Sequence, residues 1–248
     1  YGNSVAPLLI SKQGYNKSTF CRSLVPPELQ WGYNDNLVLS EKRQVLQAMC
    51  QSLVINLDEF NQISPQVQQG FLKNIIQLPS IKIKPPYGSH VQEFPRMASF
   101  VATSNMEDIL SDPSGNRRFL GVELTGPIDV SQRPNYEQLY AQALSALRAG
   151  EKTYFDAEQT RLIMANNRKF EVVSPVDQYF DLYFDLTDDA KQGEYLTAAE
   201  IFQELKSHIG SSLKLNSLIA FGRKLSQMPT IHRKRFNDGM RYLVVRKS

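Results

Sequence analysis

The stretch Ser11-Lys-Gln-Gly-Tyr-Asn-Lys-Ser-Thr19 follows the apolar run Pro7-Leu-Leu-Ile10 and leads into Phe20-Cys-Arg-Ser-Leu24, which can continue as a helix. A strand, a loop and a helix in this order are the context in which the motif G-x-x-x-x-G-K-[ST] forms a phosphate-binding loop. Further along the chain, apolar strand-like runs alternate with helical patterns, which predicts a mainly parallel sheet with helices on both faces. The stretch therefore predicts the three-layer α/β/α fold of a P-loop NTPase.

The predicted loop lacks both of its usual glycines. When the motif is aligned on Lys17, the glycine positions hold Ser11 and Asn16, and the glycine that is present, Gly14, lies between them. Asn enters left-handed backbone conformations more readily than most residues, so we expect it to be tolerated there. Lys17 can still reach the terminal phosphates, the Ser18 hydroxyl can bind Mg²⁺, and backbone N–H groups can hold the remaining charge. We expect the bound nucleotide to contact Gly14, Asn16, Lys17, Ser18 and Thr19.

Two acidic residues end the next strongly apolar run, Ser52-Leu-Val-Ile-Asn-Leu-Asp-Glu-Phe60. An NTPase keeps its second acidic motif at such a strand end. We predict that Asp58 holds Mg²⁺ directly or through water, and that Glu59 orients or deprotonates the attacking water. An isolated Asp-Glu pair at a strand end is more often the solvated start of a loop, so these roles depend on the other motifs.

Two further polar features follow in the same order as in an NTPase. Asn105 ends the apolar run Arg96-Met-Ala-Ser-Phe-Val-Ala-Thr-Ser-Asn105, where a neutral amide can bind both the terminal phosphate and the water, although such an Asn also commonly starts a turn. Arg117 and Arg118 follow Gly115-Asn116, and exposed guanidinium groups stabilise transferring phosphoryl charge, often across a subunit boundary. A surface charge pair is the plain alternative. Because all features occur together, we predict a P-loop NTPase.

The C-terminal part of the chain has a different pattern. Thr197-Ala-Ala-Glu200 fits a capping box that opens a helix, Leu215–Leu225 reads as a second helix, and Asn237-Asp-Gly239 predicts a hairpin. Two helices and a basic hairpin predict a winged helix-turn-helix. We therefore expect an ATPase domain over residues 1–150, a helical connector over 151–173 and a winged-helix nucleic-acid-binding domain over 174–248.

Composition and charge narrow the function classes. The net charge of +3 is uneven, because residues 206–248 carry ten Lys/Arg and one acidic residue, whereas residues 1–205 carry eighteen Lys/Arg and twenty-four Asp/Glu. A basic tail predicts a polyanionic partner, and a solvated basic face is the alternative. No apolar run approaches the ~20 residues that span a bilayer, and two cysteines make no disulfide framework. We expect a cytoplasmic protein without membrane contact. Since the chain starts without Met, we also expect it to be a piece of a longer protein.

Several motifs together resemble the virulence-associated E family, which consists of P-loop ATPases of mobile elements and prophages related to superfamily three helicases. The similarity covers about residues 5–125, and its most distinctive pieces are Pro85-Pro-Tyr-Gly88 and Gly115-Asn-Arg-Arg-Phe119. The C-terminal segment resembles, more weakly, the winged-helix domain of unknown function that follows this ATPase in Bacteroides-type proteins. The chain departs from the family at Ser11 and Asn16, where the family usually has glycine.

The resemblance implies a homo-oligomeric ring that acts on DNA, often with a primase-like region upstream in the parent chain. It also implies that the hairpin at about Lys82–Phe94 lines a central pore, where single-stranded DNA would contact Lys84, Tyr87 and His90. Duplex DNA would bind at the winged helix through Arg223, Lys224, Arg233, Lys234 and Arg235. A surface turn at the hairpin is the plain alternative.

Two functions stay open at this point. The first is an ATP-driven DNA helicase or translocase module in which Arg117 or Arg118 completes a neighbour's site. The second is a DNA-binding regulator or initiator that binds nucleotide without hydrolysing it, because side chains at Ser11 and Asn16 could restrict the approach of phosphates to the backbone. Ring size, polarity, DNA sequence preference and the separate roles of the two arginines do not follow from the sequence.

Overall fold

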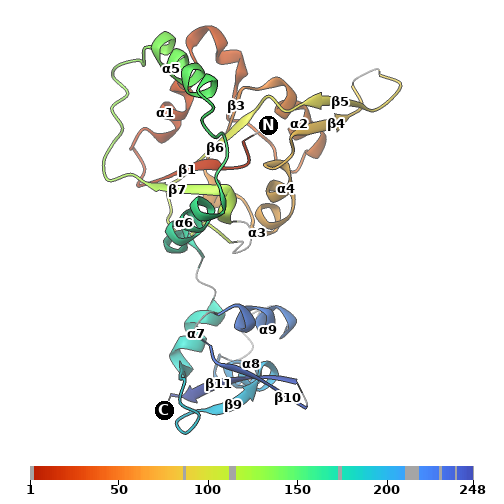
Figure 1. Ribbon diagram of the computed structural model, residues 1–248, viewed down its shortest axis with the longest axis vertical. Coiled ribbons are helices and arrows are strands. Elements are labelled where there is room, and N and C mark those ends of the chain that lie inside the picture. The colour runs from red at the N-terminus through yellow and green to blue at the C-terminus, as the bar shows by residue number, and fades with distance from the viewer. Residues whose placement is uncertain are drawn as a thin grey trace. The chain divides into compact units, whose positions relative to one another are not determined.

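The computed structural model describes residues 3–85, 88–111, 116–172, 175–209, 218–228, 231–237 and 239–247. Within it the chain divides into a first unit, Tyr1–Val172, and a second unit, Val173–Ser248 (Figure 1). None of the helices in these described ranges combines the length and the apolar character that a membrane span requires.

A five-stranded sheet forms the centre of the first unit. Its strands are β1 (Ala6–Ile10), β2 (Tyr33–Asn34), β3 (Val54–Leu57), β6 (Ser99–Ser104) and β7 (Phe119–Glu123). They lie in the order β2-β3-β6-β1-β7, and every neighbouring pair is parallel. The predicted parallel α/β fold is therefore confirmed.

Helices cover both faces of this sheet (Figure 1). They are α1 (Lys17–Ser23), α2 (Lys42–Gln51), α3 (Pro65–Val67), α4 (Lys73–Ile75), α5 (Tyr136–Arg148) and α6 (Ala157–Asn167). Successive residues of a strand point to opposite faces. Accordingly Leu8 and Ile10 of β1 join the core that contains Met49 of α2, whereas Leu9 packs in a separate cluster with Cys21 of α1.

Side-chain caps and glycines set several helix ends as the sequence predicts. The Ser64 hydroxyl accepts a hydrogen bond from the backbone N–H of Val67 at 3.4 Å, with Pro65 at the first helical position. Gly150, with φ of 81°, follows the end of α5 in the left-handed conformation that a helix terminus requires. The sequence also predicts that Ser40 caps a helix beginning at Glu41; this is wrong, because α2 begins one residue later, after Glu41, without a side-chain cap.

The helix after Ser64 contains a π-helical turn, Gln68–Leu72, between α3 and α4. The sequence pattern places on its buried face Val67, Phe71, Ile75 and Leu78. The structure buries instead Gln68, Leu72, Ile75 and Ile76. A π turn adds a residue to the helical repeat, so the buried positions of its first part lie one residue later than an α-helical period predicts.

A short antiparallel hairpin, β4 (Ser80–Ile83) with β5 (Gln92–Pro95), precedes β6 as predicted. Arg96 was expected to begin the next strand, but β6 begins at Ser99. The buried Arg96 guanidinium donates to the backbone oxygens of Ile76 and Asn3, and burial lowers its pKa. Arg96 therefore connects Asn3, near the start of the chain, with Ile76, at the end of the α3–α4 helix.

The residues expected to form a connector, 151–173, pack on the first unit almost to their end. Asn167, at the end of α6, donates from Nδ2 to the backbone oxygens of Asn116 (2.8 Å) and Phe119 (2.6 Å). Its Oδ1 accepts from the N–H of Gly121 at 3.1 Å. Phe170 lies so close to Gly121 that an added Cβ would meet its ring at 2.5 Å. The first unit therefore extends through 172, beyond the expected boundary at 150.

The second unit combines helices with an antiparallel sheet. Its helices are α7 (Pro175–Tyr183), α8 (Ala198–Ile209) and α9 (Leu218–Gln227), and its strands are β8 (Phe184–Leu186), β9 (Glu194–Thr197), β10 (Arg233–Phe236) and β11 (Gly239–Arg246). The long strand β11 pairs with the other three. The capping box at Thr197 and Glu200 and the β10–β11 hairpin are confirmed; α7, β8 and β9 were missed.

Candidate nucleotide-binding site and nucleic-acid-binding surfaces

The carboxyl ends of β1, β6 and β3 lie side by side, because β6 pairs with both of the other strands. The loop 11–19 follows β1, Asp58-Glu59 follow β3, and Asn105 follows β6. Together they line a pocket of about 280 Å³ whose walls are residues 13–19, 58–59 and 103–105. The fold thus brings the predicted nucleotide-binding residues of these three segments to one place.

The loop 11–19 has the backbone of a tight turn before a helix. Gly14 has φ of 86°, and Asn16 has φ of 59° and ψ of 23°, which is the left-handed conformation expected for it. The Asn16 carbonyl accepts the N–H of Phe20 at 2.8 Å and so begins α1. Its side chain is engaged as well, since Nδ2 donates to the backbone oxygen of Ile128 at 2.9 Å. Asn16 therefore joins the loop to the segment after β7.

Lys17 is only 6% exposed, and acceptors surround its ammonium group. Nζ donates to the backbone oxygens of Ser11 (3.0 Å) and Lys12 (3.0 Å), to Ser11 Oγ (2.9 Å) and to Asn105 Oδ1 (2.9 Å). Burial lowers the pKa of Lys17, and the charge of Asp58 partly opposes this shift. Ser11, at a position where the motif has glycine, thus supplies a side-chain acceptor for the lysine.

Asp58 and Ser18, the predicted Mg²⁺ ligands, are in direct contact. Asp58 Oδ1 accepts a hydrogen bond from Ser18 Oγ at 2.9 Å and another from Thr103 Oγ1. A hydroxyl and a carboxylate are hard oxygen donors of the kind that Mg²⁺ prefers, so the pair fits this ion. Thr103 was missed from the sequence. Thr103 could be found from the register of the parallel strands β3 and β6: Leu57 pairs with Ala102, so Asp58 and Thr103, the residues that follow them, lie side by side.

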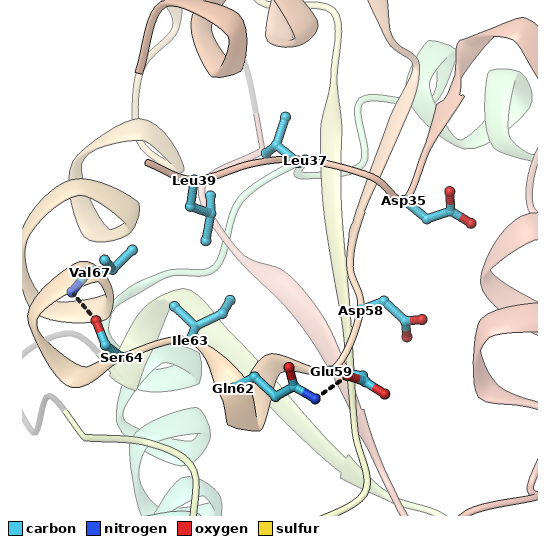
Figure 2. Close-up of a pocket in the computed structure, with 9 residues that line it drawn as sticks. All are labelled: Asp35, Leu37, Leu39, Asp58, Glu59, Gln62, Ile63, Ser64 and Val67. Carbon is cyan, nitrogen blue, oxygen red and sulfur yellow. Dashed lines mark hydrogen bonds between the residues drawn. The ribbon is translucent and has the colours of Figure 1, made fainter. Parts of the chain in front are cut away.

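Glu59 has an uncommon left-handed backbone, with φ of 49°, and its carboxylate accepts a hydrogen bond from Gln62 Nε2. Glu59 and Asp58 also border a second pocket, of about 520 Å³, formed with the segment that follows β2 (Figure 2). Figure 2 shows the carboxylates of Asp35, Asp58 and Glu59 on one side of this pocket. Gln62 was not predicted; it is three residues beyond the acid that it contacts.

The structure distinguishes the two candidate arginines, which spacing alone could not. Both lie in a short 3-10 helix, Asn116–Arg118; Arg117 is exposed and Arg118 is only 6% exposed. Only Arg117 is therefore presented to a neighbouring molecule without a change in packing. Neither arginine lines the pocket at 13–19, 58–59 and 103–105. The preceding Gly115 lies outside the described residues.

The β4–β5 hairpin carries exposed side chains near its turn. Lys84 and His90 are both exposed, and the Lys84 carbonyl accepts a hydrogen bond from Arg43 at 3.3 Å. Tyr87 lies outside the described residues. The two described candidates are therefore accessible to a ligand, and neither belongs to the pocket at the sheet edge.

The candidate DNA-binding residues of the second unit lie mostly on its edge strand. Arg233, Lys234 and Arg235 form β10 with Phe236, and all four are exposed; Arg223 of α9 is also exposed. The side chain of Lys224 is outside the described part of the chain. The exposed basic strand is available for phosphate contacts, although charged side chains also protect sheet edges from pairing with other chains.

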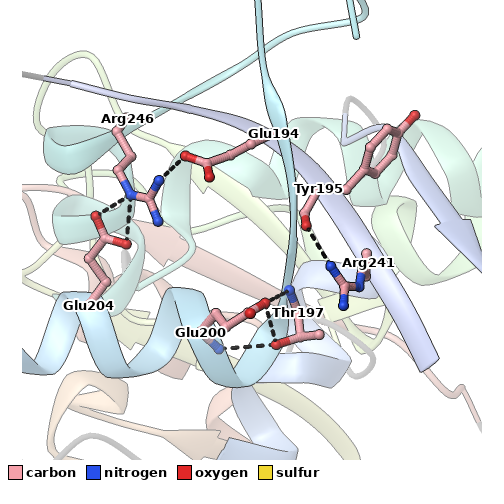
Figure 3. A network of polar contacts seen from close by, with 7 residues as sticks. All are labelled: Glu194, Tyr195, Thr197, Glu200, Glu204, Arg241 and Arg246. Atoms are coloured by element: carbon pink, nitrogen blue, oxygen red, sulfur yellow. Dashed lines mark hydrogen bonds and ion pairs between the residues drawn. The ribbon is translucent and has the colours of Figure 1, made fainter. Parts of the chain in front are cut away.

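The expected division into an acidic body and a basic tail does not follow the two units. Residues 173–248 contain eleven Lys/Arg and nine Asp/Glu, because the acids at 177–204 fold together with the basic end of the chain. Arg246 binds Glu204 at 2.7 Å and also pairs with Glu194 (Figure 3), and Lys247 pairs with Asp185 at 2.8 Å. These two cations are paired with carboxylates, so the basic surface is narrower than the sequence suggests.

The fold and the pocket define a parallel α/β domain with a candidate phosphate-binding loop, followed by a smaller unit with an antiparallel sheet. Residues 3–172 match the family described as virulence-associated protein E-like domain, so the chain belongs to this family. Residues 173–244 match a domain of unknown function from B. theta, DUF3874. The resemblance noted from the sequence motifs is confirmed for both parts.

Solved structures similar to this chain include two apo structures of the NrS-1 C-terminal region. The first has a TM-score of 0.47 and 14% identity, covering 99% of this chain and 67% of that chain. The second, the A form, has a TM-score of 0.47 and 13% identity, covering 98% of this chain and 66% of that chain. The chain thus spans about two thirds of the length of these structures. A search of curated proteins found no match.

Proposed function

We propose that this chain is the ATP-dependent DNA helicase or translocase module of a mobile-element or prophage replication protein, working as a homo-oligomer in the cytoplasm. The observation that carries the proposal is the convergence of Lys17, Ser18, Asp58 and Asn105, from the segments that follow three separate strands, on one pocket. Membership of the virulence-associated E-like family supports a role in replication.

The contacts of the pocket suggest a role for each residue. Phosphates that enter the loop would take the ammonium of Lys17 from Asn105 Oδ1 and leave the Asn105 amide free to contact the terminal phosphate. Ser18 and Asp58 would hold Mg²⁺, which neutralises the charge that develops on transferring phosphoryl groups. Glu59, when released from Gln62, would orient the attacking water.

DNA and neighbouring subunits belong to the same proposal. The exposed Arg117 would complete the site of an adjacent subunit, and the β4–β5 hairpin would contact single-stranded DNA in a ring. The helices and the hairpin of the second unit would act as a winged helix on duplex DNA. We expect duplex binding to weaken steeply as salt rises, through counterion release, and charge reversal at Arg233 and Arg235 to remove most of it. Binding that does not change with salt would contradict the phosphate contacts.

The decisive experiment measures Mg-ATP turnover of the oligomeric protein with and without DNA. Lys17→Ala and Glu59→Gln are expected to abolish turnover, and Glu59→Gln is expected to retain ATP binding. Lys12→Ala is the matched control, since its side chain is exposed and only its backbone oxygen contacts Lys17. Turnover that both site variants leave unchanged would refute the proposal.

A second candidate is a DNA-binding regulator that binds nucleotide without hydrolysing it. The observation in its favour is the ammonium of Lys17, whose three N–H groups already face four acceptors within the protein. A phosphate must compete with all of these contacts. Wild-type protein that binds Mg-ATP on DNA in a thermal-shift assay, yet shows no turnover, would favour this candidate.

A further inference from the structure

The strand alternation in the second unit separates the basic hairpin into two faces. Tyr242 and Val244 of β11 point into the core with the helices. The alternate positions of β11, Arg241 and Leu243, therefore lie on the opposite face of the sheet, which we call the outer face; Leu243 is buried there and Arg241 is half-buried. Arg241 pairs with Lys234 of β10, and Phe236 follows Lys234 on the same face. Leu243 pairs with Tyr195 of β9, which adds a second aromatic residue to this face.

Three side chains on this face, Tyr195, Lys234 and Arg241, surround the ring of Phe236. Phe236 is 37% exposed, and the centroid of its ring lies 5.3 Å from that of Tyr195 at an interplanar angle of 60°. Lys234 Nζ lies 5.7 Å, and Arg241 Cζ 5.4 Å, from the centroid of Phe236. Arg241 also donates to the backbone oxygen of Tyr195 at 3.3 Å, as Figure 3 shows. We call this group the outer-face cluster.

We propose that the outer-face cluster is a binding site for single-stranded DNA, on the opposite face of the β10–β11 hairpin from Arg233 and Arg235. A base would stack on Phe236 or Tyr195, and the adjacent phosphates would contact Lys234 and Arg241. Aromatic and cationic groups together bind single-stranded DNA without sequence preference, because every base has a π face that can stack and every phosphate between nucleotides carries a negative charge. The proposal rests on the proposed role in DNA replication, but not on ATP hydrolysis.

The chemistry favours a single strand over a duplex as the occupant. In a duplex the faces of the bases are covered by their neighbours, so an aromatic ring on a sheet surface gains little from it beyond contact with the backbone. The cations at Lys234 and Arg241 alone would serve both forms equally. The partly exposed Phe236 ring therefore determines the preference, and its removal should affect single-stranded DNA selectively.

The test compares binding of a fluorescent 15-nucleotide oligo(dT) and of a 15-base-pair duplex to the 248-residue chain by anisotropy. Phe236→Ala is expected to weaken oligo(dT) binding about tenfold while leaving duplex binding within about twofold. Arg235→Ala is the matched control, because it changes the neighbouring residue on the opposite side of β10. It should weaken duplex binding and leave oligo(dT) binding within about twofold. Equal losses of both DNA forms in Phe236→Ala would overturn the proposal.

A spectroscopic readout separates stacking from a purely structural role of the ring. The chain has one Trp, Trp31. Phe236→Trp in a Trp31→Phe background therefore places the only indole at the cluster. Quenching of its fluorescence by oligo(dT), but not by the duplex, is expected if bases stack there. Absence of quenching at saturating oligo(dT) would refute the site. If the chain without site mutations showed no ATP turnover on DNA, but the indole at position 236 were still quenched by oligo(dT), the proposed ATPase function would be refuted and the single-strand site would stand.

Discussion

Replacing Asn16 with Ala tests whether Asn16 stabilises the left-handed backbone conformation that a glycine would otherwise adopt at this position of the loop. Asn16 has φ of 59° and ψ of 23°, and its Nδ2 donates to the Ile128 oxygen at 2.9 Å. The left-handed conformation costs an ordinary L-residue about 1–2 kcal/mol, and the lost hydrogen bond adds about 0.5–1.5 kcal/mol. We expect Asn16→Ala to lower the free energy of unfolding of the first unit by about 2 kcal/mol. This corresponds to a fall of about 4–8 °C in Tm.

The companion variant Asn16→Gly separates the two contributions. Glycine removes the same hydrogen bond but has no penalty in the left-handed region, so we expect stability to change by less than about 1 kcal/mol. Because Asn16 already has the conformation that glycine would adopt, we expect turnover of Mg-ATP to change by less than about threefold.

The assay is urea unfolding followed by circular dichroism, together with steady-state turnover of Mg-ATP on DNA. Two results would refute the reasoning. If Asn16→Gly raised turnover tenfold or more, the Asn side chain would be an obstacle to the phosphates. If Asn16→Ala were as stable as the wild type, neither the backbone conformation nor the contact with Ile128 would matter.

Three further predictions concern packing, Asp58 and a buried thiol. Gly121→Ala places a Cβ 2.5 Å from the Phe170 ring; we expect urea unfolding to show a loss of about 1–3 kcal/mol, and no loss would mean that Phe170 is free to move. Thr103→Val removes the hydroxyl that donates to Asp58; kcat is expected to fall about tenfold with little change in KM, with rescue in Thr103→Ser, and an unchanged kcat would exclude a positioning role. Burial, aided by the charge of Asp58, raises the pKa of Cys21 to about 12. At pH 8 its thiol therefore stays protonated, and in a Cys50→Ser background we expect a maleimide dye to modify Cys21 only in urea, with rapid labelling of the native protein as the contrary result.

Local sequence rules predicted the elements that local chemistry determines. The cap at Ser64, the capping box at Thr197 and the β10–β11 hairpin all depend on residues a few positions apart, and all three are present. The parallel sheet followed from the alternation of apolar runs with helical patterns, and the polar groups at the strand ends followed from the edge at which parallel strands terminate.

What the sequence did not predict depends on contacts between distant segments. Thr103 lies beside Asp58 only because β3 and β6 pair in one particular register. Asn167 and Phe170 belong to the first unit because Gly121 lets them approach β7 closely. The π turn at Gln68–Leu72 changes which side chains are buried without leaving a pattern that an α-helical period would detect.

The charge distribution shows the same limit and changes what the second unit can bind. Counting along the chain separates Arg246 from Glu194 and Glu204, although the fold joins them in one network (Figure 3). Among the described residues of this unit, the exposed cations that adjoin one another are then the three of β10, Arg233, Lys234 and Arg235. Binding of DNA to this unit then depends on a few side chains, which is why single substitutions are informative there.

The two glycine positions of the phosphate loop lead to a similar conclusion about function. Glycine serves in such loops by taking conformations that other residues resist and by leaving room for phosphates. Asn16 meets the first requirement and fastens the loop to Ile128, while Ser11 adds an acceptor for Lys17. Whether the loop leaves room for phosphates depends on Ser11, because its hydroxyl accepts a hydrogen bond from the Lys17 ammonium that a phosphate would have to bind. If ATP turns over, Ser11→Gly should therefore bind nucleotide more tightly, and a weaker affinity would show instead that Ser11 positions Lys17 for its ligand.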